Sequence, residues 1–259
     1  MQSTVPDEVF GPVDIIQLSE HGKYNRIRTG SITECHIAFA DEVYKANSVV
    51  LNGLLKIINE RELDEIGMPT IKVPLISVFG ASNEVPSDDM LRAFDDRFIL
   101  REIIQDIGDD AAFVHMLTAK SQPPQAFLSL QDIEAAQQEV QAVKGTNELL
   151  QGVIELRHKV AEQGIYVSPR RWKHALTLIK AHTWLDGLGE TTIEDMAVLA
   201  HCLWTDPKER KTVERLVYTM ACPLHLRALE IEDNAAELAN SLPKEEDATF
   251  TAASENALQ

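Results

Sequence analysis

Two short apolar runs in the first hundred residues predict β-strands that are buried on both faces. Residues 36–40 (HIAFA) end abruptly at Asp41 and Glu42, and residues 75–79 (LISVF) lead into residues 80–83 (GASN). Short apolar runs bounded by charged or turn residues are typical of interior strands in a parallel sheet. Between them, apolar residues recur at helical spacing over residues 49–58, which predicts an amphipathic helix. A strand, a helix and a second strand predict an α/β fold with a parallel sheet.

The pattern changes near Asp106, where strand signals give way to helical ones. Ser168 followed by Pro169 predicts a helix start, and the spacing of Thr191 and Glu194 predicts a capping box at another. The predicted fold class is therefore α/β followed by an all-α part. We expect four segments, namely an α/β part over residues 1–105, a connector over 106–125 that contains QPPQ, a helical part over 126–225, and an acidic, partly disordered tail over 226–259.

Composition and charge narrow the functions that this fold could serve. The chain has 259 residues, and its net charge of −17 argues against binding to nucleic acid or anionic lipid. It leaves open a compact anion such as a nucleotide, which needs only a local site and a metal ion. No stretch approaches the roughly 18 apolar residues of a membrane span, and the N-terminus lacks the pattern of a signal peptide. Three widely spaced cysteines favour reduced thiols in the cytoplasm.

The first candidate for chemistry is the acidic pair Asp41 and Glu42, at the carboxyl end of the first predicted strand. Mg²⁺ takes oxygen ligands and keeps most of its waters, so one carboxylate on a rigid strand end can hold it. A neighbouring carboxylate can polarise an attacking water. The alternative is a charged strand end without a catalytic role, and the spacing alone is compatible with both interpretations.

Asn83 is the second candidate, because it follows the second predicted strand. Ligands of open parallel sheets bind outside the carboxyl ends of the strands. Asp41, Glu42 and Asn83 are therefore expected to share one edge of the sheet. The alternative is that Asn83 serves only as a turn residue.

Arginines are the remaining polar candidates. Their guanidinium groups are planar and permanently charged, which suits phosphate recognition and draws attention to Arg97, Arg170 and Arg171. The alternative for each is a surface ion pair, which contributes little to stability. The sequence contains no H-E-x-x-H or C-x-x-C motif, so motifs support no metal site other than one for magnesium.

Five segments occur in an order that resembles the MoxR branch of AAA+ ATPases, and within it the RavA-type regulatory ATPases. They are FGPVDIIQLSEHGKYNRIRTGSI, IAFADEVYKANSVVLNGLLKIINER, VPLISVFGASNEVP, LRAFDDRFILR and VSPRRWKHAL. The resemblance covers roughly residues 5–206. It implies that residues 1–105 form the second half of an AAA+ nucleotide-binding core and that residues 126–225 form its helical lid.

The resemblance implies roles for the residues at the strand ends. Asp41 and Glu42 correspond to the Walker B pair, as the magnesium-site acid and the base that activates water. Asn83 corresponds to sensor 1, which orients that water. The implied cofactors are ATP and Mg²⁺.

The resemblance also assigns the arginines. Arg97 corresponds to the arginine finger, which reaches the nucleotide of a neighbouring subunit. Arg170 corresponds to the sensor 2 arginine of the lid, with Arg171 as the less favoured candidate. Residues 10–32 correspond to the helix-2 insert, a β-α-β element.

The implied activity is ATP hydrolysis coupled to remodelling or chaperone-like action on partner proteins. The implied assembly is a homo-oligomeric ring, a hexamer in intact members, working with a protein that carries a von Willebrand factor A domain. We expect no partnership with nucleic acid and no membrane span.

One departure from the family pattern concerns the phosphate-binding loop. The sequence contains no G-x-x-x-x-G-K-[ST], the Walker A motif whose backbone amides and lysine hold the phosphates. We therefore expect an amino-terminally truncated ATPase that is inactive alone and exposes an unpaired sheet edge. The alternative is a hydrolysis-incompetent interaction fragment that docks on or complements an AAA+ ring. A non-ATPase α/β enzyme is a third possibility, without a site of its own in the sequence.

Overall fold

The computed structural model describes residues 5–65, 69–120 and 127–224, together with positions 227, 228, 231, 234, 235 and 238. The chain divides into two compact units, Met1–Leu100 and Arg101–Gln259, which are described separately below. The QPPQ segment of the predicted connector lies outside the described residues, as does most of the predicted tail.

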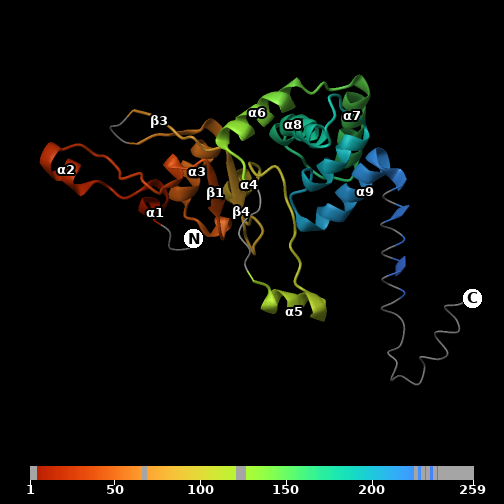
Figure 1. Ribbon diagram of the computed structural model, residues 1–259, viewed down its shortest axis with the longest axis horizontal. Coiled ribbons are helices and arrows are strands. Elements are labelled where there is room, and N and C mark those ends of the chain that lie inside the picture. Colours follow the sequence, from red (N-terminus) through yellow and green to blue (C-terminus); the bar gives the residue numbers. More distant parts are fainter. Residues whose placement is uncertain are drawn as a thin grey trace, which may run out of the picture. The chain divides into compact units, whose positions relative to one another are not determined.

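The first unit is built on a two-stranded parallel sheet with a crossover helix (Figure 1). Strand β1 (Ile37–Ala40) pairs in parallel with β4 (Ser77–Gly80). Ile37 lies beside Ser77 at the start of the strands, and Ala40 lies beside Gly80 at their end. Helix α3 (Ser48–Glu60) lies between them in the sequence. The predicted strand–helix–strand order and the parallel pairing are confirmed.

Helix α3 forms because its start and its apolar face are both well specified. The Asn47 side chain accepts hydrogen bonds from the amides of Val49 and Val50 at 3.1 and 3.0 Å, which caps the helix. The apolar face enters the core of the unit through Val50, Leu51, Leu54 and Ile57. The helix ends at Glu60, and the capping residue Arg61 adopts the left-handed conformation at φ 59°.

The other elements of this unit are short. Helices α1 (Pro6–Phe10) and α2 (Ile15–His21) are followed by a segment that returns to form one antiparallel bridge between Val13 and Arg26. Strands β2 (Glu62–Leu63) and β3 (Ile71–Lys72) pair antiparallel, and helix α4 (Asp89–Asp95) closes the unit. Two 3₁₀ turns, η1 (Ile32–Glu34) and η2 (Val43–Lys45), flank β1.

The expectation that both strands are buried on both faces is wrong. Ala38, Ala40 and Val78 face the core formed with α3. On the opposite face Ile37, Phe39 and Phe79 are 53%, 72% and 58% exposed. Side chains alternate across a strand, and within the described part of this unit no helix covers that second face.

The second unit consists of helices. It contains α5 (Asp110–Thr118), α6 (Leu130–Ala142), α7 (Asn147–Glu162), α8 (Pro169–Leu185), η3 (Glu194–His201), η4 (Pro207–Glu209) and α9 (Arg210–Ala221). Helix α8 packs against α6 and η3, and α9 packs against α7 and η3. Ser168 caps α8 as predicted, by accepting the Arg171 amide at 3.1 Å. None of the helices in the described residues is long and apolar enough to cross a membrane.

The predicted capping box at Thr191 and Glu194 does not form. The Thr191 hydroxyl instead accepts the Thr146 amide at 3.0 Å, which ties this segment to the start of α7. One residue later Asp195 accepts the Thr192 amide at 2.6 Å. The segment that follows, η3, is a 3₁₀ helix.

Candidate functional site

The candidate site lies where the parallel strands β1 and β4 end. The pairing continues one step beyond the strands, because the Ala81 amide donates to the Ala40 carbonyl at 2.9 Å and the Val43 amide to the Ala81 carbonyl at 3.0 Å. These bonds hold the segment with Asp41 and Glu42 beside the segment that leads to Asn83. The carboxyl ends of both strands thus meet at one edge of the sheet.

Asp41 and Glu42 form a tight turn directly after β1. The Asp41 side chain is exposed, and its Oδ1 accepts the Glu42 amide at 2.9 Å. Glu42 adopts the left-handed conformation at φ 48° and ψ 45°. A residue other than glycine in this conformation costs about 1–2 kcal/mol and persists only where its surroundings enforce it. Such residues concentrate at functional sites.

Lys45 is a member of the site that no sequence motif indicated. Its ammonium lies 2.8 Å from Glu42 Oε1 and 3.9 Å from Glu84 Oε1. The hydrogen bond from Lys45 is the main reason why the pKa of Glu42 lies below its usual value, and the same bond raises the pKa of Lys45. Glu42 is therefore ionised at neutral pH, as a group that polarises water must be. The signal available in the sequence was a lysine three residues after the glutamate.

Asn83 lies in the bend after β4 and is exposed. The Ser82 side chain shapes this bend, since its hydroxyl accepts the Glu84 amide at 3.0 Å and donates to the Glu84 carbonyl at 3.1 Å. Among the described residues the Asn83 side chain makes no hydrogen bond that would support the bend. The turn thus forms without help from the Asn83 side chain, whose amide group is available to bind a ligand.

The candidate arginines differ in their surroundings. Arg97 follows α4 in the first unit, and its Nη1 donates to the Ala93 carbonyl. In the second unit Arg170 is exposed at the start of α8. Arg171 is buried, and its Nη1 donates to the Trp204 carbonyl at 2.9 Å.

The donor chemistry at the strand ends fits magnesium. Asp41 offers an exposed carboxylate, a hard oxygen ligand of the kind that Mg²⁺ binds together with several waters. The 259 residues contain no match to the Walker A motif G-x-x-x-x-G-K-[ST], so the motif adds no phosphate ligands to those at the strand ends.

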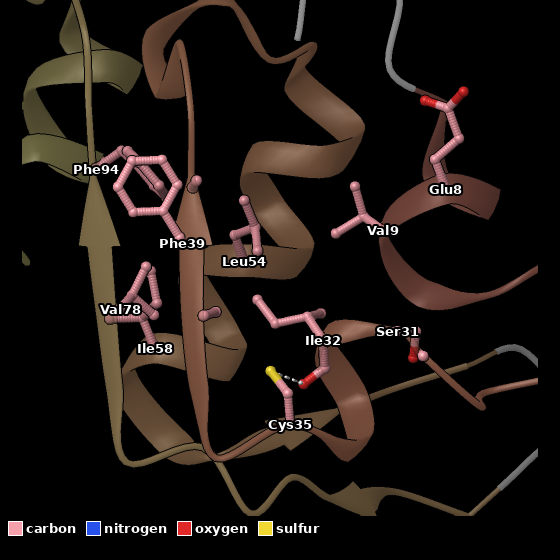
Figure 2. Close-up of a pocket in the computed structure, with 13 residues that line it drawn as sticks. Glu8, Val9, Ser31, Ile32, Cys35, Phe39, Leu54, Ile58, Val78 and Phe94 are labelled. Atoms are coloured by element: carbon pink, nitrogen blue, oxygen red, sulfur yellow. Dashed lines mark hydrogen bonds between the residues drawn. The ribbon is translucent and has the colours of Figure 1, made fainter. Parts of the chain in front are cut away.

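A separate pocket opens beside β1, and Figure 2 shows Val9, Ile32 and Leu54 around it. It encloses about 320 Å³ and is lined mostly by apolar groups. Cys35 lines it as a thiol, because burial raises the pKa of that group. An apolar lining without a cationic side chain is unsuited to a triphosphate, so this pocket is not the nucleotide site.

The fold is that of the AAA+ ATPases, a parallel strand–helix–strand unit followed by a helical lid. A solved structure of a candidate ATPase from Cytophaga hutchinsonii matches it with a TM-score of 0.62 at 16% identity, over 83% of this chain and 73% of that chain. Residues 148–217 match an AAA lid domain.

Residues 2–144 match the family described as the MoxR domain in the MoxR-vWA-beta-propeller ternary systems. The chain belongs to this MoxR family of AAA+ ATPases. Two uncharacterised proteins of Methanocaldococcus jannaschii are similar. MJ0079 is 34% identical over 240 residues, which cover 92% of this chain and 63% of the relative. MJ0812 is 33% identical over 242 residues, which cover 93% and 64%. The chain thus spans less than two thirds of their length.

Proposed function

We propose that the protein acts in a RavA-like AAA+ ATPase of the cytoplasm that couples ATP hydrolysis to remodelling of partner proteins. The observation that carries the proposal is the in-register parallel pairing of β1 with β4. Asp41, Glu42 and Asn83 follow directly after these strands. Polar groups at adjacent strand ends of an open parallel sheet are the usual setting for a bound ligand.

The roles at this edge follow from the chemistry of each group. Asp41 would hold Mg²⁺, which neutralises charge on the phosphates when it is bound. Glu42, kept ionised by Lys45, accepts a hydrogen bond from the attacking water and increases the electron density on its oxygen. Asn83 orients the same water through its side-chain amide.

The arginines would supply positive charge from two directions. Arg97 would act as the finger that reaches the nucleotide of a neighbouring subunit in a ring, with a hexamer as the proposed assembly. Of the two lid arginines, the exposed Arg170 is the better candidate for a phosphate contact. Arg171 uses its guanidinium inside the helical unit.

The proposed partner is a protein with a von Willebrand factor A domain. Support comes from the matching family, which is described as the MoxR domain of MoxR-vWA-beta-propeller ternary systems. Binding of this chain to such a domain, measured with the purified proteins, tests the proposal directly.

A second candidate function is an interaction subunit that does not hydrolyse ATP by itself. The observation in its favour is the missing Walker A motif in the 259 residues. Loss of one preorganised charge-stabilising donor typically costs about 10²–10³ in rate, and a whole loop supplies several such donors. Such a chain would dock on an AAA+ ring or complement a separate piece that carries the loop.

The deciding experiment measures Mg·ATP turnover of this chain alone and of a form extended by an amino-terminal segment that carries the phosphate-binding loop. We expect negligible turnover for the chain alone and activity in the extended form. In the extended form Glu42→Gln should retain ATP binding and lose about 10²-fold or more in turnover. Glu60→Gln, which removes an exposed carboxylate from the end of α3, is the matched control with unchanged turnover.

Four results would contradict these expectations. Turnover by the chain alone at the rate of the extended form would remove the second candidate function. Loss of ATP binding in the Glu42→Gln protein would make that residue structural, and an unchanged rate would remove it from the reaction. Absence of turnover in an extended form that binds ATP would leave the interaction subunit as the function.

A further inference from the structure

Three potential metal ligands converge where the end of α8 meets η3. His182 lies in the last turn of α8, Asp186 caps that helix, and Asp195 lies in the first turn of η3. The His182 Nδ1 atom is 3.4 Å from Asp186 Oδ2 and 3.7 Å from Asp195 Oδ1. One ligand atom from each residue lies within 4.8 Å of the others. No motif in the sequence pointed to this group.

The spacing of these atoms is that of ligands around a small cation. Zn²⁺ binds imidazole nitrogen and carboxylate oxygen at about 2.0–2.2 Å in tetrahedral geometry, which places neighbouring ligand atoms about 3.3–3.6 Å apart. Of the two distances from His182 Nδ1, the one to Asp186 lies within this range and the one to Asp195 lies just above it. The contact with Asp195 is too long for a hydrogen bond, so the two groups attract each other directly only as an ion pair with a protonated imidazole.

One carboxylate and one ring nitrogen of this group are withdrawn from solvent. The Asp195 side chain is only 5% exposed, whereas the His182 and Asp186 side chains are 39% and 55% exposed; the His182 Nδ1 atom itself is buried without a hydrogen-bond partner. Buried polar atoms in folded proteins are nearly always paired, so an unpaired ring nitrogen aimed at two carboxylates calls for an explanation. A cation between the three groups would satisfy the nitrogen and both carboxylates together.

Neighbouring groups support a cation at this position. The Thr192 amide and hydroxyl donate to Asp195 Oδ2 at 2.6 and 3.1 Å, which orients the carboxylate and directs Oδ1 toward His182. Metal ligands are commonly fixed by hydrogen bonds of this kind. The site also lies at the carboxyl end of α8, where the helix dipole favours positive charge.

We propose that His182, Asp186 and Asp195 bind a divalent transition-metal ion, with Zn²⁺ as the representative, and that this ion fastens the end of α8 to η3. One imidazole and two carboxylates suit Zn²⁺ and its neighbours in the first transition row, whereas Mg²⁺ and Ca²⁺ select oxygen ligands alone. The ion would stiffen the helix whose first turn carries Arg170. The site is independent of the magnesium site proposed at the sheet edge.

The test is a titration of the metal-free chain with Zn²⁺ in competition with a chromophoric chelator, together with a Co²⁺ absorption spectrum. We expect one ion per chain, a Co²⁺ spectrum without thiolate charge transfer, and a higher unfolding temperature of the helical unit with Zn²⁺. His182→Asn and Asp195→Asn should each weaken Zn²⁺ binding by about 100-fold or more, since removal of a supporting group alone costs about 10–100-fold. Asp186→Asn removes an exposed ligand and keeps the proposal testable if Asp195→Asn does not fold.

Two control variants make the outcome specific. His174→Asn removes an exposed imidazole from the same helix and should leave Zn²⁺ binding unchanged. Cys222→Ser tests the neighbouring thiol, whose pKa is raised by burial and by the carboxylates of Glu194 and Asp195, and it too should bind Zn²⁺ normally. Binding that is lost in Cys222→Ser or His174→Asn but retained in His182→Asn would overturn the proposal. Absence of 1:1 binding to the wild-type chain would also overturn it.

Discussion

The adjacent arginines at the start of α8 provide a test that separates a structural arginine from one available to a ligand. Arg171 is 1% exposed, and its Nη1 donates to the Trp204 carbonyl at 2.9 Å, the Thr205 hydroxyl at 3.2 Å and the Cys202 carbonyl at 3.4 Å. Arg170 is exposed. We predict that Arg171→Ala strongly destabilises the helical unit, whereas Arg170→Ala leaves its free energy of unfolding almost unchanged.

The magnitude follows from what Arg171 leaves behind. A hydrogen bond from a charged donor contributes about 1.5–3 kcal/mol net, and removal of the buried methylenes adds a cavity cost. The Trp204 carbonyl keeps one donor, because Arg101 Nη1 also lies 2.9 Å from it. We therefore expect a loss of about 2–4 kcal/mol in the free energy of unfolding. Substitutions at exposed sites such as Arg170 usually stay within about 0.5 kcal/mol.

The shared carbonyl gives the prediction a second, sharper form. Either single variant, Arg101→Ala or Arg171→Ala, leaves one arginine on the Trp204 oxygen, whereas the double variant removes both donors from a residue that is 4% exposed. An unsatisfied buried carbonyl costs about 1–3 kcal/mol. The double variant should therefore be less stable than the sum of the single variants by roughly this amount.

The assay is urea unfolding followed by tryptophan fluorescence. All three tryptophans (Trp172, Trp184 and Trp204) lie in the second unit, so the signal reports on that unit. The differences in the free energy of unfolding are calculated from the urea concentrations at the unfolding midpoints, with the same m-value for all variants. A free energy of unfolding for Arg171→Ala within about 0.5 kcal/mol of the wild type would refute the structural role of Arg171, and so would an equal loss of stability in Arg170→Ala.

Two further predictions concern the first unit. Gly11 has a φ of +94°, and a Cβ there would lie 2.0 Å from the Ile27 carbonyl oxygen. Gly11→Ala should therefore lower the free energy of unfolding by about 2 kcal/mol or more, as measured by thermal unfolding. Gly22→Ala, at a φ of +60° with no atom within 4 Å, is the control and should cost about 1 kcal/mol; equal losses would contradict the clash. Because the Lys45 hydrogen bond lowers the pKa of Glu42, their ion pair stabilises the fold at neutral pH, and that stability is lost as the pH falls through the lowered pKa. Lys45→Met should raise the Glu42 pKa toward its ordinary value in an NMR titration, and an unchanged midpoint would show that Lys45 is not the cause.

The sequence predicted the strands and their order correctly, but it did not predict how they are covered. The sequence pattern reports which residues are apolar, and both runs carry apolar residues at positions that point to each of the two faces of the strand. Burial depends on the elements that pack on each face, and here α3 covers the face of Ala38 and Ala40. Phe39 on the other face remains 72% exposed. Apolar runs therefore indicated the strands without showing that one of their faces stays open in this chain.

The sequence predicted the part of the candidate site that lies directly after the two strands, and no more of it. Parallel pairing places the groups after β1 and β4 at one edge, so Asp41 and Asn83 followed from the pattern. The pairing of Lys45 with Glu42 occurs in a 3₁₀ turn that begins with a left-handed residue, and no apolar pattern encodes such a turn. The sequence also could not show that Arg171 is structural while Arg170 is exposed, because the role of Arg171 depends on its hydrogen bond to Trp204 in a distant segment.

The group around His182 shows how one residue of register decides which side chains meet. The sequence pattern predicts a capping box of Thr191 and Glu194, in which the Glu194 side chain would accept a hydrogen bond from the Thr191 backbone amide. In the structure the Thr191 hydroxyl is used by the Thr146 amide, and the reciprocal contact shifts to Thr192 and Asp195. The Thr192 amide holds one oxygen of Asp195, a side chain that is 5% exposed, and the other oxygen lies 3.7 Å from His182 Nδ1. The proposed metal site therefore depends on a hydrogen bond between segments 45 residues apart, and Thr191→Val should weaken Zn²⁺ binding although Thr191 is not a ligand.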